Sequence, residues 1–287
     1  AGACYLCRPM ALDQPQEDTG HEMSFLDHLE ALRWHLVRSA IAILAFGTLA
    51  FIYKDFIFDG ILLAPKYHDF PTYRFFCWLS QVLFHDDSIC LGDLNFELIS
   101  ISMSGQFTAH ITVAIVTGVI LAFPYLLWEI WRFIKPALYQ NERKYANGLV
   151  FWGTFLFLLG VAFGYYVITP LSVFFFGNYQ VSTLVSNQIG LNSFISTVVT
   201  TTFGSGLVFE LPIVIYFLAK IGLVGPEFLR NTRKVSYVII LIVAAVITPP
   251  DVTSQIIVSI PLFILYEISI VIASRVEKNR LAELKSR

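Results

Sequence analysis

The sequence predicts an all-α membrane protein with six transmembrane helices, a cap on the outer face and both termini in the cytoplasm. Three observations support this fold class: the composition, a series of long apolar stretches and the distribution of lysine and arginine. Of the 287 residues, 56% are hydrophobic and 14% are charged, and the mean hydropathy is +0.68. Because soluble domains carry about 25% charged residues, this composition excludes a soluble globular protein.

Apolar stretches of about 18 to 25 residues recur along the chain, and each is long enough to cross roughly 30 Å of hydrocarbon. The fifth stretch is an exception, since its length of about 14 residues gives roughly 21 Å as a straight helix. There the bilayer thins or the span ends early. The expected spans are 34–53, 106–131, 148–169, 191–219, 235–248 and 256–273.

Lysine and arginine in the connecting loops predict the orientation, because positively charged loops stay on the cytoplasmic side. The long loop after the first span holds only Lys54, Lys66 and Arg74. Basic residues gather instead before the first span, after the second and fourth, and after the sixth. Both termini are therefore expected in the cytoplasm. The basic residues on that side are Arg33, Arg38, Arg132, Lys135, Arg143, Lys144, Lys220, Arg230, Arg233, Lys234, Arg275, Lys278, Arg280, Lys285 and Arg287.

The chain divides into three parts. Residues 1–22 are polar and mixed, which predicts a disordered or expression-derived tail without the apolar core of a secretory signal peptide. Cys4 and Cys7 in this tail lack a second cysteine pair, so they make a weak metal or redox motif. Residues 23–273 form the transmembrane domain, and residues 274–287 form a basic cytoplasmic tail.

The outer loop 54–105 is too long for a structureless connection and is expected to fold into a cap. Residues 56–65 and 73–84 are amphipathic on a helical period, as in segments that lie at a membrane surface. Residues 94–102 alternate like a short strand. Cys77 and Cys90 both lie in this loop, where an oxidising periplasm permits a disulfide between them.

Glu210 lies inside the apolar run 206–216, where a charged side chain costs roughly 2.5 to 3.5 kcal/mol. Pro212 lacks an amide proton, which predicts a kink beside the acid. Glu210 is either a protonated acid hydrogen-bonded to a neighbouring helix or a functional contact. At about 100° per residue the acid shares one helical face, expected to point inward, with Asn192, Ser196, Phe203 and Gly206.

The other polar residues of the spans have simpler interpretations. Glu267 is expected to be buried and to make a packing hydrogen bond, and Glu129 to form a helical ion pair with Arg132. His110 and Gln106 are expected to bond between helices. Since the sequence has neither a histidine and carboxylate cluster at metal spacing nor a recognisable nucleophile, it predicts no catalysis, cofactor or metal.

Glu142 stands out in the loop "WRFIKPALYQNERKYA" because it is an acid in a basic segment. A carboxylate there can accept an incoming guanidinium, and each such charge-assisted bond contributes about 1.5 to 3 kcal/mol. This favours a receptor for a cationic peptide. The alternatives are a proton-coupled small-solute transporter, with Glu210 and Glu267 relaying protons, and a structural scaffold.

Several motifs in order resemble the TatC family, the polytopic receptor subunits of the twin-arginine protein translocase. The resemblance runs from about residue 23 to residue 273 and is specific when the motifs are taken together. The motifs are "HLEALR" at 28–33, "LLAP" at 62–65, "FPYLLWEIWRFIKPALYQNER" at 123–143, "FELP" at 209–212 and "ITPPDVTSQ" at 247–255.

The resemblance implies a cup-shaped bundle in a bacterial inner membrane that receives the twin-arginine signal peptide of a folded precursor protein. It also implies assembly with single-span TatA and TatB-type subunits and transport driven by the proton-motive force. In the family, a glutamate matched here by Glu142 binds the paired arginines, and Phe133 matches a recognition residue. Glu30 and Arg33 belong to the first-helix motif.

Other family positions also have counterparts. Pro65 matches the proline of the first outer loop, Tyr165 a tyrosine of the third helix, and Glu210 the intramembrane acid of the fourth. Partner subunits dock in the family at positions matched by Thr248, Asp251 and Gln255.

One position departs from the family pattern. Ala31 stands where a second arginine-binding glutamate is expected in the first-helix motif. Glu30 is adjacent, but one helical residue turns a side chain by about 100°. The difference is either a deliberate change or a lineage that uses Glu30, and it is expected to weaken recognition.

Overall fold

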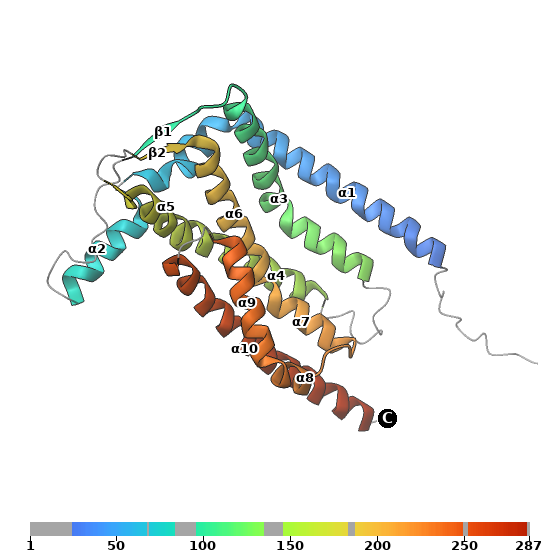
Figure 1. The fold of residues 1–287 in the computed structure, drawn as a ribbon. Coiled ribbons are helices and arrows are strands. Elements are labelled where there is room, and N and C mark those ends of the chain that lie inside the picture. The colour runs from blue at the N-terminus through green and yellow to red at the C-terminus, as the bar shows by residue number, and fades with distance from the viewer. Residues whose placement is uncertain are drawn as a thin grey trace, which may run out of the picture.

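The structure, a computed structural model, describes residues 25–67, 69–83, 96–134, 146–182, 187–248 and 252–285. The described chain is helical except for loops and two three-residue strands, which confirms the predicted all-α class. The cap elements lie at one end of the helix bundle, and α8 and the C-terminus lie at the other (Figure 1).

Five helical segments in the described ranges are long and apolar enough to cross a membrane. Two of them are composite, because η5 (Gly164–Ile168) and α5 (Thr169–Asn178) continue α4, and α7 (Leu211–Lys220) continues α6. Apolar helices suit a bilayer because they satisfy their backbone hydrogen bonds internally. The main helices are α1 (Phe25–Ile52), α3 (Gly105–Ile134), α4 (Ala146–Phe163), α6 (Leu191–Phe209) and α10 (Val252–Lys285).

The fifth predicted span is the helix α9 (Arg233–Ile247), of 15 residues. At about 22 Å it is shorter than an ordinary span, as its sequence predicts, so its crossing of the membrane stays a prediction. The short helix α8 (Pro226–Asn231) precedes it. Helix α10 continues without a break to Lys285, so residues 274–285 of the predicted tail extend the helix of the last span.

Helices α1 and α3 form an antiparallel pair (Figure 1). They approach closely at two glycines, where a Cβ on Gly118 would lie 2.7 Å from the backbone nitrogen of Gly47. Nearer the cap, the His110 ring stacks on Phe51 at 3.9 Å between centroids. His110 Nε2 also bonds the Phe51 carbonyl oxygen at 3.1 Å, which confirms a bond between helices.

Small residues also bring α4 and α6 together. Gly160 and Gly164 form a small-xxx-small pair, the pattern that lets transmembrane helices approach closely. A Cβ on Gly164 would lie 2.5 Å from the Thr201 carbonyl oxygen, and the Ser205 hydroxyl donates to the Gly160 carbonyl at 2.7 Å. Hydrogen bonding between helices therefore supplements van der Waals packing at this seam.

A second core joins α7, α8, α9 and α10. Ile240 and Ala244 of α9 pack with Leu262 and Tyr266 of α10 in one buried cluster. The Tyr266 hydroxyl donates to the Leu229 carbonyl at 2.9 Å, which attaches α8 to the last helix.

The cap consists of the π-helix η1 (Phe56–Leu62), the 3-10 turn η2 (Ala64–Lys66), α2 (Pro71–Leu83), β1 (Glu97–Ile99) and β2 (Gln188–Gly190). The first three elements and β1 confirm the helices and the strand predicted for the loop. Strand β2 was not predicted. It pairs in parallel with β1, with Leu98 opposite Ile189.

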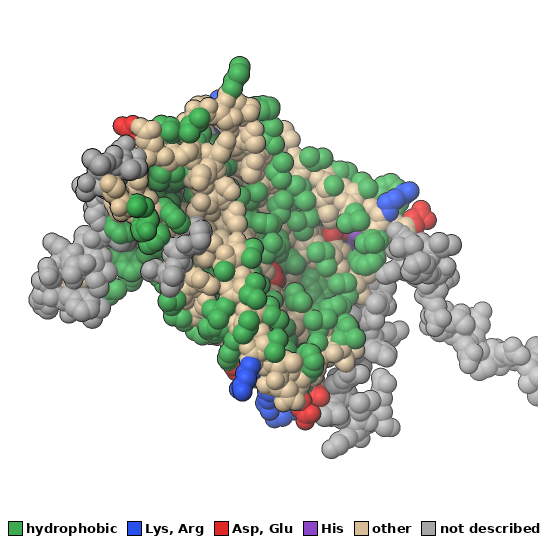
Figure 2. Space-filling view, viewed as in Figure 1, with side chains coloured by type: hydrophobic (Ala, Val, Ile, Leu, Met, Phe, Trp, Pro, Cys, Tyr) green, Lys and Arg blue, Asp and Glu red, His purple; other side chains and the backbone are tan. Residues whose placement is uncertain are grey.

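The face shown in Figure 2 is largely hydrophobic between its two ends, and most of its charged side chains gather at those ends. Large apolar side chains such as Ile41, Leu44 and Ile52 are exposed on α1. An apolar exterior with polar ends matches the cross-section of a bilayer.

Candidate functional site

The start of α1 carries the first-helix motif. The side chains of Glu30 and Arg33 are exposed there, and the Arg33 guanidinium lies over the Trp34 ring at 5.6 Å from its centroid. Ala31 is half-buried, so the residue in the place of the expected glutamate lies on the side of α1 that is turned toward the protein.

Phe133, in the last turn of α3, is half-buried and lies against the first helix. Its ring meets the His35 ring edge to face, with centroids 5.9 Å apart and an interplanar angle of 68°. The structure thus brings Phe133 to the beginning of α1, where Glu30 and Arg33 lie. Glu142 belongs to residues 135–145, which fall outside the described ranges.

Glu129 does not form the predicted ion pair with Arg132. Its carboxylate is 1% exposed, accepts a hydrogen bond from the Tyr125 hydroxyl at 2.7 Å and bonds His35 Nδ1 of α1. The Arg132 guanidinium lies instead over the Trp128 ring at 5.4 Å. The prediction was wrong because Glu129 points into the α1 interface, whereas Arg132 is exposed.

Glu210 interrupts the fourth apolar segment between α6 and α7, with Pro212 in the first turn of α7. This break confirms the predicted kink, since proline lacks the amide proton that would continue the α6 ladder. Glu210 is buried at 8% exposure. Within the described part of the chain, its Oε1 has no hydrogen-bond partner.

The surroundings of Glu210 come from two neighbouring helices. A Cβ built on Gly153 of α4 would lie 3.4 Å from Glu210 Oε2 and 2.9 Å from Leu127 of α3. Gly206 on the same helical face is buried, but Asn192 and Ser196 are exposed. This face is therefore buried only where α6 packs against α4. For the exposed first turns of α6, the inward orientation stays a prediction.

Glu267 is 40% exposed rather than buried. It accepts hydrogen bonds from Tyr237 at 2.6 Å and from Arg233 at 2.7 Å. The predicted packing bond is present, and an ion pair with the start of α9 accompanies it. Helical periodicity did not reveal this partner because α9 and α10 are separate segments.

The residues matched to partner docking lie around the junction of α9 and α10. Thr248 is buried, and its hydroxyl donates to the Ala244 carbonyl at 2.9 Å. Gln255 Nε2 donates to the Leu241 carbonyl at 3.4 Å. Asp251 lies outside the described residues.

The two positions matched as structural, Pro65 in the cap and Tyr165 in η5, are both hydrogen-bonded. The buried Tyr73 hydroxyl donates to the carbonyls of Pro65 at 2.8 Å and Pro170 at 3.2 Å, and its burial raises the pKa of Tyr73. The Tyr165 hydroxyl donates to the Ile61 carbonyl at 2.7 Å. Cys77 is disulfide-bonded. Cys90 lies outside the described residues, so its pairing with Cys77 stays a prediction.

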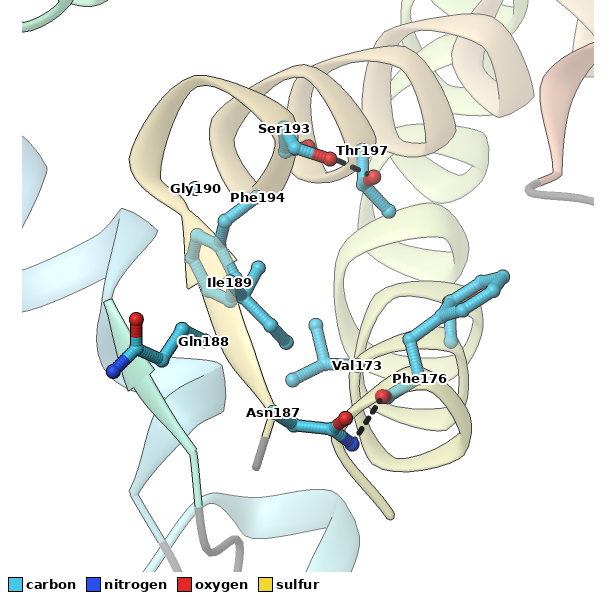
Figure 3. Close-up of a pocket in the computed structure, with 10 residues that line it drawn as sticks. Val173, Phe176, Asn187, Gln188, Ile189, Gly190, Ser193, Phe194 and Thr197 are labelled. Carbon is cyan, nitrogen blue, oxygen red and sulfur yellow. Dashed lines mark hydrogen bonds between the residues drawn. The ribbon is translucent and has the colours of Figure 1, made fainter. Parts of the chain in front are cut away.

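A cavity of about 460 Å³ lies between α5, β2 and the start of α6 (Figure 3). Asn187 donates to the Phe176 carbonyl at its edge, and Val173, Ile189 and Phe194 supply apolar walls. None of the predicted site residues lines this cavity.

The comparisons with known proteins agree with one another. The TatC family, described as Sec-independent protein translocase protein, matches residues 27–261. A TatC of Blattabacterium is 40% identical over 262 residues, which cover 91% of this chain and 98% of that protein. A TatC of Aquifex aeolicus is 33% identical over 249 residues, covering 86% and 93%.

The fold agrees as well. A crystal structure of the twin arginine translocase receptor TatC superposes with a TM-score of 0.67 at 32% identity, covering 87% of this chain and 99% of that one. These similarities favour a translocase component over a small-solute transporter or an enzyme. The chain is a membrane protein of the TatC family of Sec-independent protein translocases.

Proposed function

We propose that this chain is the receptor that binds the paired-arginine signal peptide of folded precursor proteins in a bacterial inner membrane. The observation that carries the proposal is the contact between the end of α3 and the beginning of α1. There the family recognition residue Phe133 lies against His35, on the same helix as the exposed Glu30 and Arg33.

Glu142 is the main acceptor for the arginines in this proposal, with Phe133 packing against the peptide. Glu30 is the remaining acid of the first-helix motif. Because Ala31 cannot accept a hydrogen bond through its side chain, the paired arginines lose one charge-assisted contact. Glu210 provides a buried polar point for the inserted peptide or for a partner helix.

TatA and TatB-type subunits dock in this proposal around the α9 and α10 junction, where Thr248 and Gln255 lie and to which Asp251 belongs by sequence. The distribution of lysine and arginine supports cytoplasmic termini and a cap on the outer face. Transport then needs an assembly of several subunits driven by the proton-motive force.

The test is peptide binding to the purified chain in lipid nanodiscs. A peptide with two adjacent arginines is compared with its double-lysine counterpart, because lysine cannot make a bidentate contact with a carboxylate. We expect tighter binding of the arginine peptide and a loss of about tenfold to a hundredfold in Glu142→Gln.

Glu97→Gln is the matched control, since Glu97 is an exposed acid in the cap at the far end of the bundle. It should leave the affinity unchanged. Equal binding of both peptides, or equal losses in both variants, contradicts the receptor proposal.

A further inference from the structure

His35, Glu129 and Tyr125 form a closed polar cluster between α1 and α3. Both carboxylate oxygens are engaged, Oε1 by the Tyr125 hydroxyl and Oε2 by His35 Nδ1. Glu129 is almost fully buried and His35 is 16% exposed. Because buried charges in proteins are normally paired, the cluster fixes His35 and Glu129 relative to each other.

The cluster is a buried polar contact in a part of α1 that otherwise packs on α3 through half-buried side chains. From residue 30 to residue 49, α1 has no buried side chain. The backbone contact with Gly118 is at Ile43 and Gly47, about 12 to 18 Å along the helix from His35. The bond between His35 and Glu129 therefore holds the beginning of α1 against α3.

The same imidazole also reaches the recognition surface, because its ring packs against Phe133. One side chain thus contacts both the buried acid and the residue matched to peptide recognition. Glu30 and Arg33 lie within about two helical turns of His35.

We propose that His35 and Glu129 are positioning residues, which hold the beginning of α1 at a fixed place relative to Phe133 and so preorganise the peptide-binding surface. Preorganisation raises affinity by reducing the ordering that binding must otherwise impose. This inference rests on the proposed function and adds residues that do not themselves touch the arginines.

Two substitutions at one position separate the roles of the ring. His35→Phe keeps a ring beside Phe133 but leaves Glu129 Oε2 without its partner. His35→Asn keeps an NH group near the place of Nδ1 but removes the ring. The control is His110→Phe, the same change at the other end of the helix pair, where His110 bonds the Phe51 carbonyl.

The measurements are affinity for the arginine peptide, thermal unfolding and the distance between spin labels at positions 30 and 130. Both positions are exposed, and Cys4 and Cys7 are replaced by serine. We expect His35→Phe to weaken binding about tenfold and to broaden the distance distribution. His35→Asn should keep the distribution narrow, and His110→Phe should bind like the parent protein.

A narrow distribution and parent-like affinity in His35→Phe overturn the inference. So does an equal loss of affinity in His110→Phe, which would mark a general loss of stability. If the parent protein itself does not prefer arginine to lysine, the receptor proposal fails. In that case the label distances still decide whether His35 holds α1.

Discussion

Glu210 combines deep burial with a carboxylate oxygen that has no hydrogen-bond partner in the described chain. An unsatisfied buried polar group costs about 1 to 3 kcal/mol. Glu210 lies beside Gly153, where no Cβ competes for the space. In the proposed receptor, Glu210 lowers the folding stability of the chain in exchange for a polar contact used in transport.

Replacing Glu210 should raise folding stability and lower export. We expect Glu210→Met to stabilise the purified protein by about 1 to 3 kcal/mol while lowering export, because methionine fills the site without an unpaired oxygen. Thermal unfolding in detergent and export in cells lacking their own TatC measure the two effects. Glu97→Met, at an exposed position, should change neither. Undiminished export by Glu210→Met rules out a direct role for the acid.

Ala31 offers a test in the opposite direction. In the proposed receptor, Ala31→Glu supplies the glutamate expected from the first-helix motif and one more charge-assisted bond to an arginine. The affinity for the paired-arginine peptide should therefore rise roughly tenfold to a hundredfold. Titration of the peptide against both proteins measures the gain. Ala31→Gln adds a side chain of similar size without the charge and should recover less. A gain of equal size in the glutamine variant assigns the effect to packing rather than charge.

Among the helices, the close packing of two pairs, α1 with α3 and α4 with α6, depends on glycine. At Gly164, the first residue of η5 where it continues α4, a Cβ would overlap Ser205 Oγ and lie 2.5 Å from the Thr201 carbonyl oxygen. The carbonyl belongs to the backbone of α6 and cannot rotate away. Helix spacing at this seam is therefore set by the absence of a side chain.

Gly164→Ala should separate α4 from α6 and destabilise the protein by about 1 to 3 kcal/mol, the usual cost of overpacking. Gly148→Ala is the control on the same helix, because nothing lies within 4 Å of its Cβ position. The changes in unfolding temperature relative to the parent protein should have opposite signs in the two variants, or clearly different sizes. Equal stability of both variants would show that the seam tolerates wider spacing.

The cap is attached to the bundle by Tyr73, whose hydroxyl bonds the carbonyls of Pro65 and Pro170. Tyr73→Phe removes both bonds to these carbonyls, so we expect about 1 to 3 kcal/mol of destabilisation and faster proteolysis of the outer loop. Tyr67→Phe changes an exposed ring in the same loop and should be neutral. Limited proteolysis that fails to distinguish these variants contradicts this attachment.

Burial also gives the Tyr73 contact a pH dependence. The pKa of Tyr73 is raised above its ordinary value of 10.0, so the unfolded chain loses this proton first. The contribution is fully present below pH 10 and is lost as the pH rises through the higher pKa of the folded protein. We expect the parent cap to become more sensitive to protease above pH 10, and Tyr73→Phe to lack that part of the response.

For the whole molecule, the spans were predictable because a bilayer requires every backbone polar group to be satisfied inside the segment. Length and apolarity therefore identify helices without any knowledge of their neighbours. Strand β2 was not predictable in this way, because its three residues depend on a partner roughly ninety residues earlier in the chain. The contact of Glu129 with His35 was missed for the same reason. Helical periodicity predicts on which face of its own helix a side chain lies, but not which other helix that side chain contacts.

The orientation of the molecule has a direct test. Tyr179 and Leu223 are exposed beyond opposite ends of the fourth apolar segment. The charge distribution predicts that the first lies outside and the second in the cytoplasm. An impermeant thiol reagent should label Tyr179→Cys in intact cells and Leu223→Cys only after permeabilisation. The reverse pattern would invert the proposed orientation.

The parallel pairing of β1 with β2 has a consequence for biogenesis. The two strands immediately precede α3 and α6 in the chain, so their pairing joins the entry points of two helices that are inserted at different times. Contacts between residues that are far apart in sequence form late, because a large loop must close first. The α1 and α3 hairpin can assemble while the ribosome is still translating the second half, whereas the cap is completed only after residue 190 has emerged. Truncated nascent chains that end before β2 should therefore keep β1 open to quality-control proteases.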